Sequence, residues 1–340
     1  MKAAAALLAV LLAGGAAAAE DGSSALLGGA YPLEASVSFS AGLFHWVDSL
    51  AGTSGGKTIP LHQSQFEERF GRPDAKDMDA LRRFQAIRAR GPARGANGML
   101  GAFLEGPDLE GALRTLRPEL GEVDTEGLRA CLEHFRERYA QIWQDGKVPQ
   151  GFLEKALQDP VRKDLAELLG RMAKFFGFDP TGGPTPRLVV VPVPQGGGTH
   201  AEAVGRNLLI EVRPLEGLAD QAPPIVHENA HFLWNQVPVE KRNGITRTVG
   251  EIPYGKEALA ALREALPTAL GQGVAGRAFL GKRWSTSAPW YHTDEVDAYG
   301  KALYPLVQAA LDTGLRFDET LAARMARAYP KPPPARVTPR

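Results

Sequence analysis

The sequence is poor in three features, and each shortage excludes a class of protein. It holds a single cysteine, Cys131, which excludes an internal disulfide and a lipid anchor on a cysteine near the N-terminus. Lys and Arg together number 39, as do Asp and Glu, so no basic excess points to nucleic acid as a partner. Beyond the N-terminal segment, no run approaches the ~18 apolar residues of a membrane-spanning helix. The composition, 44% hydrophobic and 23% charged, is that of a globular protein.

Residues 1–19 have the pattern of a secretory signal peptide. Lys2 gives a positive start, residues 3–12 are apolar, and the alanines at 17–19 offer a cleavage site. We therefore expect a mature chain in the periplasm or outside the cell, with no integral membrane segment after cleavage.

The remaining chain predicts an α+β fold with a change of character near residue 178. Residues 20–178 form a mainly helical region, with helices expected at 77–89, 126–144 and 160–176, and residues 37–50 ambiguous between strand and helix. Residues 179–329 contain the predicted sheet and further helices. Residues 330–340 are Pro-rich and are expected to be disordered.

Two strands are predicted at the start of this second region. Residues 187–192 form a β-branched run, and residues 207–212 follow after a Gly-rich break. The second run carries Glu211 among apolar residues, which fits an ordinary interior strand and also a strand with an exposed edge; we favour the edge strand, along which an extended peptide could pair. Helices are expected from Pro223 to about Asn235, around 256–266, and from near Thr293.

The strongest motif is HExxH, formed by His227, Glu228 and His231. Four residues advance a helix by just over one turn, so both histidines fall on one face and can share a metal. Glu228 would lie beside a metal-bound water and can accept its proton. The surrounding residues are uncharged, which is typical of a buried helix with polar groups kept for a site.

This order of two strands, an HExxH helix and a later helix with an acidic residue resembles the zincin-type zinc metallopeptidases. It is most similar to the gluzincins, in which the third ligand is a glutamate. The resemblance covers about residues 185–312 and implies Zn²⁺ bound by His227, His231 and a glutamate. The third histidine of the metzincin motif is absent, because Asn235 to Pro238 follow the helix instead.

The identity of the third ligand stays open between two glutamates. Glu251 lies 20 residues after His231, an interval seen in thermolysin-like enzymes, but Ile252-Pro253 favours a loop there. Glu295 lies 64 residues after His231, at the start of a helix that Thr293 can cap, and it is the preferred candidate. Asp294 and Asp297 are weaker alternatives. The aspartate that gluzincins place four residues after this glutamate is replaced by Tyr299.

Other polar residues carry weaker signals. Tyr291 and His292 directly precede the helix of Glu295 and are candidates to stabilise a developing oxyanion. Four further histidines stand alone in the sequence, which favours a structural or solvated role: His45, His62, His134 and His200.

The sequence therefore predicts an exported zinc metallopeptidase that binds about one zinc ion and hydrolyses peptide or protein substrates, with Glu228 as general base. The alternative is a zincin-like module that binds zinc or serves as a scaffold without catalysis. Retention of Glu228 favours the enzyme, because a purely structural zinc site does not need it.

Overall fold

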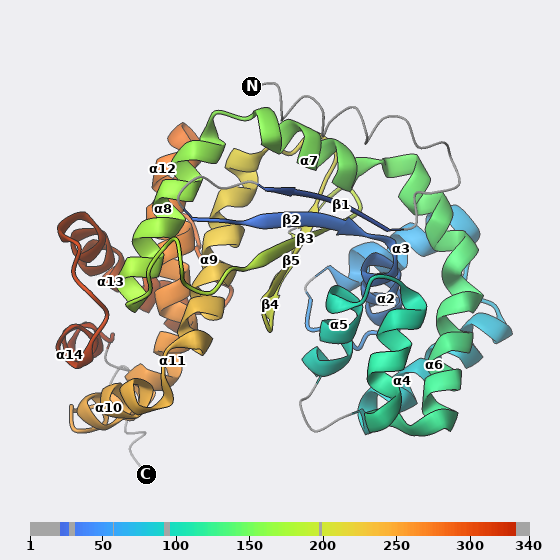
Figure 1. Cartoon of the computed structure of the whole chain (residues 1–340), viewed down its shortest axis with the longest axis horizontal. Coiled ribbons are helices and arrows are strands. Elements are labelled where there is room, and N and C mark those ends of the chain that lie inside the picture. Colours follow the sequence, from blue (N-terminus) through green and yellow to red (C-terminus); the bar gives the residue numbers. More distant parts are fainter. Residues whose placement is uncertain (1–20, 27–30, 57, 92–95, 197–198, 331–340) are drawn as a thin grey trace, which may run out of the picture. The chain divides into compact units, whose positions relative to one another are not determined.

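The computed structural model describes residues 21–26, 31–56, 58–91, 96–196 and 199–330. This part of the chain has a mixed α+β fold, in which many helices accompany one small sheet (Figure 1). The expected signal peptide and residues 331–340 of the expected tail lie outside the described residues. None of the helices that are described has both the length and the apolar character needed to cross a bilayer.

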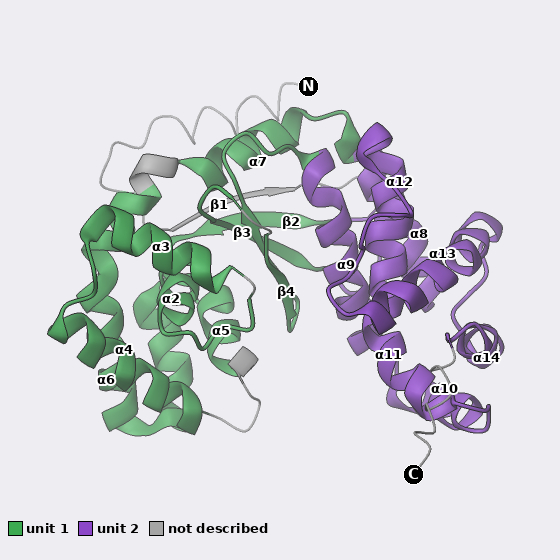
Figure 2. Ribbon diagram, turned by 180° about the vertical axis from the view of Figure 1, so that it is seen from behind, with its two compact units in different colours: residues 1–27, 33–162, 185–218 green, residues 28–32, 163–184, 219–340 purple. Residues whose placement is uncertain are grey.

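Two compact units alternate along the chain (Figure 2). Unit 1 takes Met1–Leu27, Leu33–Arg162 and Thr185–Leu218, and unit 2 takes Gly28–Pro32, Lys163–Pro184 and Ala219–Arg340. The sequence predicted two consecutive regions with one boundary near residue 178, whereas each unit in the structure is made of several separate segments of the chain. The reason is that the sheet combines strands from both sides of that position.

The sheet of unit 1 has the strand order β1-β2-β3-β5-β4. β1 (Asp21–Leu26) and β2 (Glu34–Ser38) are antiparallel, whereas β2, β3 (Arg187–Pro192) and β5 (Asn207–Val212) run parallel to one another. β4 (Ala201–Val204) closes the sheet as an antiparallel edge strand. The strands predicted at 187–192 and 207–212 are confirmed.

The expectation that residues 207–212 form an edge strand is wrong. β5 pairs with β3 on one side, Val190 opposite Ile210, and with β4 on the other, Ala203 opposite Leu208. All six of its residues are buried, Glu211 included. The acidic residue that suggested an exposed edge is instead buried among polar partners, and β5 has no free edge on which a peptide could pair.

Helices surround the sheet of unit 1. They are α2 (Phe39–Leu50), α3 (Ile59–Phe70), α4 (Ala75–Arg90), α5 (Ala96–Glu105), α6 (Leu109–Gly146) and α7 (Val148–Gln158). α7 lies on one side of the sheet, and α2 and α5 on the other (Figure 1). α4 begins with a capping box between Asp74 and Asp77, and α6 bends at Gly121, which has a φ of 76°. The helices predicted at 77–89 and 126–144 lie within α4 and α6.

The secondary-structure elements described in unit 2 are all helices, joined by loops. After α8 (Val161–Phe176), whose first two residues belong to unit 1, come α9 (Leu218–Gln236), α10 (Val239–Gly250) and α11 (Gly255–Thr268). A π-helical segment, η1 (Ala269–Ala275), continues α11 directly and leads into α12 (Gly276–Phe279) and the short 3₁₀ helix η2 (Gly281–Arg283). α13 (Asp294–Thr313) and α14 (Glu319–Arg327) complete the unit.

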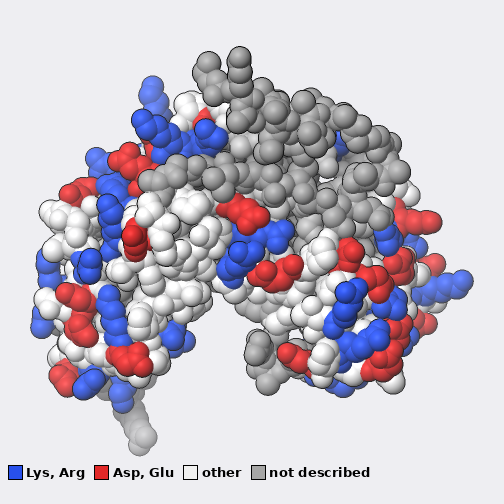
Figure 3. All heavy atoms as spheres, viewed as in Figure 1, with Lys and Arg blue, Asp and Glu red and all other residues white. Residues whose placement is uncertain are grey.

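Acidic and basic side chains are interspersed on one face of the molecule. On the face drawn in Figure 3, lysine and arginine alternate with aspartate and glutamate over the described residues. This mixture agrees with the equal numbers of acidic and basic residues in the sequence. Among the described residues of this face there is no continuous basic stripe of the kind that follows a nucleic-acid backbone.

Candidate metal centre

The HExxH motif lies in α9, as the sequence predicted. The helix starts earlier than expected, at Leu218, so that Pro223 and Pro224 fall inside it rather than at its first turn. Each proline lacks an N–H and removes one hydrogen bond of the helical ladder. The apolar neighbours of the motif are almost fully buried: Ile225, Val226, Ala230, Phe232 and Leu233. This packing fixes the face on which the two histidines stand.

The two imidazoles converge through the same ring nitrogen. Nε2 of His227 and Nε2 of His231 are 3.2 Å apart, because residues four positions apart in a helix share a face. His227 is 9% exposed and Glu228 is 8% exposed. Oε1 of Glu228 lies 4.0 Å from Nε2 of His227, so a carboxylate stands directly beside the paired nitrogens.

A third potential ligand comes from α11. Oε2 of Glu264 lies 3.5 Å from Nε2 of His227 and 3.4 Å from Nε2 of His231. The side chain of Glu264 is 40% exposed, so the centre opens to solvent on its side. His227, His231 and Glu264 form one of two groups, among the residues that the structure describes, whose geometry suits a metal ion.

The distances within this group fit zinc. Ligand atoms at about 2.0–2.1 Å from a tetrahedral ion are separated from one another by about 3.3 Å. The three separations here are 3.2, 3.4 and 3.5 Å. Two histidines with one glutamate, leaving a fourth position, form the ligand set of a catalytic zinc site rather than a closed structural one.

The charges of the group are also matched to a cation. Burial raises the pKa of Glu264, but hydrogen bonds with His227 and His231 outweigh burial and hold that pKa well below its usual range. Burial lowers the pKa of His231, but its hydrogen bond to Glu264 and the charge of Glu228 outweigh burial and raise that pKa. The geometry therefore favours positive charge at the point where the three ligand atoms meet.

Tyr291, which the sequence singled out, does reach this centre. Its hydroxyl donates a hydrogen bond of 3.1 Å to Oε2 of Glu264, and its ring lies nearly parallel to that of His227. Burial and the carboxylates of Glu264 and Glu228 raise the pKa of Tyr291, so its hydroxyl keeps its proton at neutral pH and remains a donor. His292, the other predicted residue, is exposed, and its described ring contact is with Tyr291.

The loop that carries Tyr291 is fixed to the start of α13. Oδ1 of Asp297 accepts hydrogen bonds from the backbone N–H groups of Trp290 and Tyr291, at 2.5 and 3.3 Å. Oδ2 of the same carboxylate binds Nζ of Lys301 at 2.7 Å. Asp297, considered as a possible ligand from the sequence, is thus engaged in holding this loop.

The structure differs from the sequence on the third ligand. Glu295 is exposed at the first turn of α13, where it accepts a hydrogen bond from the hydroxyl of Tyr329, and it is not in the group with the histidines. Glu251 is exposed at the C-terminal end of α10. Glu264 lies in a helix that the sequence predicted. Neither of the two ligand spacings taken from the gluzincins, which pointed to Glu251 and Glu295, pointed to Glu264. The available signal was its place next to Ala265 and one turn after Ala261, at the border of the buried face of α11.

A close contact between η1 and α9 supports the position of His227. A β-carbon on Gly271 would lie 2.6 Å from the carbonyl oxygen of Pro223 and 2.9 Å from Cβ of His227. Only glycine allows this approach without a shift of the backbone. π-helical turns are often found at functional sites, and this one places its small residue against His227.

Replacing Gly271 with alanine is expected to destabilise the fold by ~1–3 kcal/mol and to weaken metal binding, because the added methyl group pushes against α9. Gly250→Ala is the matched control, since a β-carbon there meets nothing within 4 Å. Chemical denaturation and metal content measure the two effects. Equal denaturation midpoints for the two variants would show that the contact carries no constraint.

Comparison of the chain with protein-family models, with curated proteins and with solved structures finds no match.

Proposed function

We propose that the chain is an exported zinc-dependent metallopeptidase with a gluzincin-like centre. The observation that carries the proposal is the near-regular triangle formed by Nε2 of His227, Nε2 of His231 and Oε2 of Glu264. The ligand assignment replaces Glu295 with Glu264. The aspartate expected four residues after the third ligand is again missing, because that position is Thr268.

A zinc ion held by these residues would act as a Lewis acid: it would polarise the carbonyl group of the scissile peptide bond and lower the pKa of a bound water. Glu228 lies beside the ligand nitrogens but outside the triangle, which suits a general base rather than a ligand. In the proposed reaction, Glu228 takes the proton of the attacking water and passes it to the leaving amine. The hydroxyl of Tyr291 has a single proton, which it donates to Glu264; it would turn from Glu264 to donate that proton to the developing oxyanion.

A cavity of about 230 Å³ in unit 2 is a candidate for a substrate side chain. His231 contributes to its wall together with the apolar residues Trp234, Leu262 and Phe317. Arg242 and Arg263 also line it, so an acidic group next to an apolar one would find complementary surroundings. Peptide substrates with acidic residues or a free C-terminal carboxylate are therefore the first to test.

The purified mature chain is expected to cleave members of a mixed peptide library, to lose this activity with a chelator, and to regain it when zinc is added. Mass spectrometry of the products measures cleavage, and elemental analysis measures zinc. Zinc binding without any cleavage would favour the non-catalytic scaffold. Absence of zinc from protein purified without chelators would contradict the proposal.

A further inference from the structure

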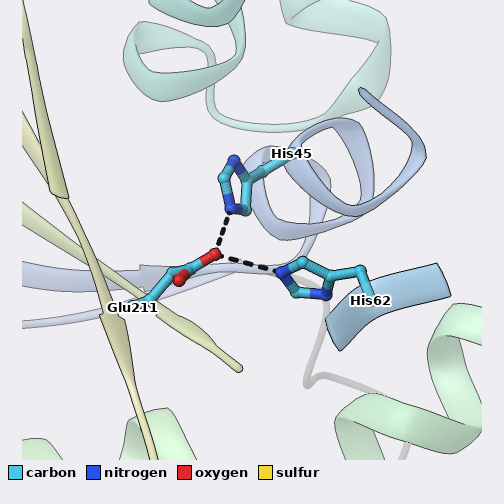
Figure 4. A group of neighbouring side chains, drawn as sticks. All are labelled: His45, His62 and Glu211. Atoms are coloured by element: carbon cyan, nitrogen blue, oxygen red, sulfur yellow. Dashed lines mark hydrogen bonds and ion pairs between the residues drawn. The ribbon is translucent and has the colours of Figure 1, made fainter. Parts of the chain in front are cut away.

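A second group of histidines and a carboxylate lies in unit 1, formed by residues that stand far apart in the sequence. His45 comes from α2, His62 from α3 and Glu211 from the central strand β5, and their side chains point toward one another (Figure 4). The three residues are 3%, 1% and 0% exposed. The expectation that His45 and His62 stand alone is therefore wrong.

Several donors converge on the carboxylate of Glu211. Its Oε1 atom lies 2.8 Å from Nε2 of His45, 3.0 Å from Nε2 of His62 and 2.8 Å from the hydroxyl of Thr58, which donates to it. Its Oε2 atom accepts a hydrogen bond of 2.8 Å from the backbone N–H of His200. Thr58 and His200 thus orient the carboxylate, as outer partners orient the ligands of metal sites.

We propose that unit 1 holds a second transition-metal site, formed by Nε2 of His45, Nε2 of His62 and Oε1 of Glu211, with zinc as the first candidate ion. Two imidazoles and one carboxylate are a ligand set that suits zinc, and the three ligand atoms lie within 4.8 Å of one another. Because the three residues come from separate elements, a bound ion would tie α2 and α3 to the sheet.

The other ring nitrogen of His62, Nδ1, is buried and has no hydrogen-bond partner among the described residues. A neutral imidazole that binds a metal through Nε2 carries its proton on Nδ1, and that proton would have no acceptor here. The assignment therefore rests on the three converging ligand atoms and the groups that orient Glu211.

Binding requires a small adjustment of the side chains. Ligand atoms around tetrahedral zinc are about 3.3 Å apart, whereas the separations here are 2.8 and 3.0 Å, so the imidazoles would move away from Glu211 by a few tenths of an ångström. The ring of His200 stacks on that of His45 with centroids 6.0 Å apart, and it lies outside the group of three ligand atoms.

The test is the metal content of the full mature chain. After reconstitution with zinc we expect about two ions per chain in the wild type and about one in the double variant His227→Ala/His231→Ala, which lacks the HExxH ligands. His62→Gln should also retain about one ion, at the HExxH histidines. The triple variant His62→Gln/His227→Ala/His231→Ala should retain none. His134→Gln is the matched control, because His134 pairs with the single carboxylate of Asp77 and should keep both ions.

Binding of Co²⁺ gives a second measurement of the site, in a variant whose substitutions lie outside unit 1. The variant His227→Ala/His231→Ala loaded with Co²⁺ should show the strong visible absorption of a tetrahedral ion, and a chelator should lower its melting temperature. If this variant binds neither zinc nor cobalt and the chelator has no effect, the group is a hydrogen-bonded network only and the proposal is overturned. The outcome is independent of peptidase activity, so the metallopeptidase proposal can fail while this one holds.

Discussion

The variant Glu228→Gln is expected to lose peptide hydrolysis almost completely while retaining its zinc. Glutamine has nearly the same size and fills the same buried space, but it cannot accept a proton from water. General base catalysis typically contributes ~10²–10⁴-fold to the rate, so kcat should fall by at least that factor. Zinc content should stay at the wild-type level, because Glu228 stands beside the three ligand atoms and is not one of them.

Steady-state kinetics on the best library peptide, with elemental analysis of the same sample, measures both quantities. Glu251→Gln serves as the control, since Glu251 is exposed at the end of α10. A variant that lost zinc together with activity would assign Glu228 to the metal instead. Wild-type activity in Glu228→Gln would remove the general base from the proposed mechanism.

Glu264→Ala is expected to reduce zinc affinity far more than Glu295→Ala. The loss should exceed the ~10–100-fold that removal of an outer partner of a metal ligand costs, because a direct ligand disappears. Glu295 lies at the start of α13, and Glu295→Ala removes only the surface hydrogen bond that Tyr329 donates to it, so its effect on zinc should be small. Competition with a chromogenic chelator measures the two dissociation constants.

The two variants form a matched pair, because each removes one glutamate from a helix of unit 2. Circular dichroism shows whether both remain folded before the affinities are compared. The reverse order of affinities would restore Glu295 as the third ligand. Equal affinities for both variants and the wild type would leave zinc bound by the histidines without either glutamate.

The local elements of this fold could be predicted from the sequence, since their signals are short-range. The β-branched run at residues 187–192 and the spacing of the apolar residues in α4 depend on neighbours within one strand or helix. The HExxH motif is local in the same sense, because one helical turn brings His227 and His231 together.

The third member of each histidine group was not predictable in this way. Glu264 meets the HExxH histidines only because α11 packs against the rest of unit 2, and no periodicity within α11 encodes that contact. Glu211 lies 166 positions from His45, and its charge within a strand suggested an exposed edge rather than buried partners. In both cases the glutamate meets the histidines through the packing of segments that are distant in the sequence.

The parallel pairing of β2 with β3 has a consequence for how the chain folds as it is made. Ser36 and Leu188 contact each other across 152 positions, and helices of both units lie between them in the sequence. Such a distant pairing forms late, because a long loop must close before the contact stabilises it. Until β3 leaves the ribosome, β2 lacks its parallel neighbour, and an unpaired strand edge is a site of association between chains. The growing polypeptide should therefore be most prone to aggregation during synthesis of the segment between these two strands.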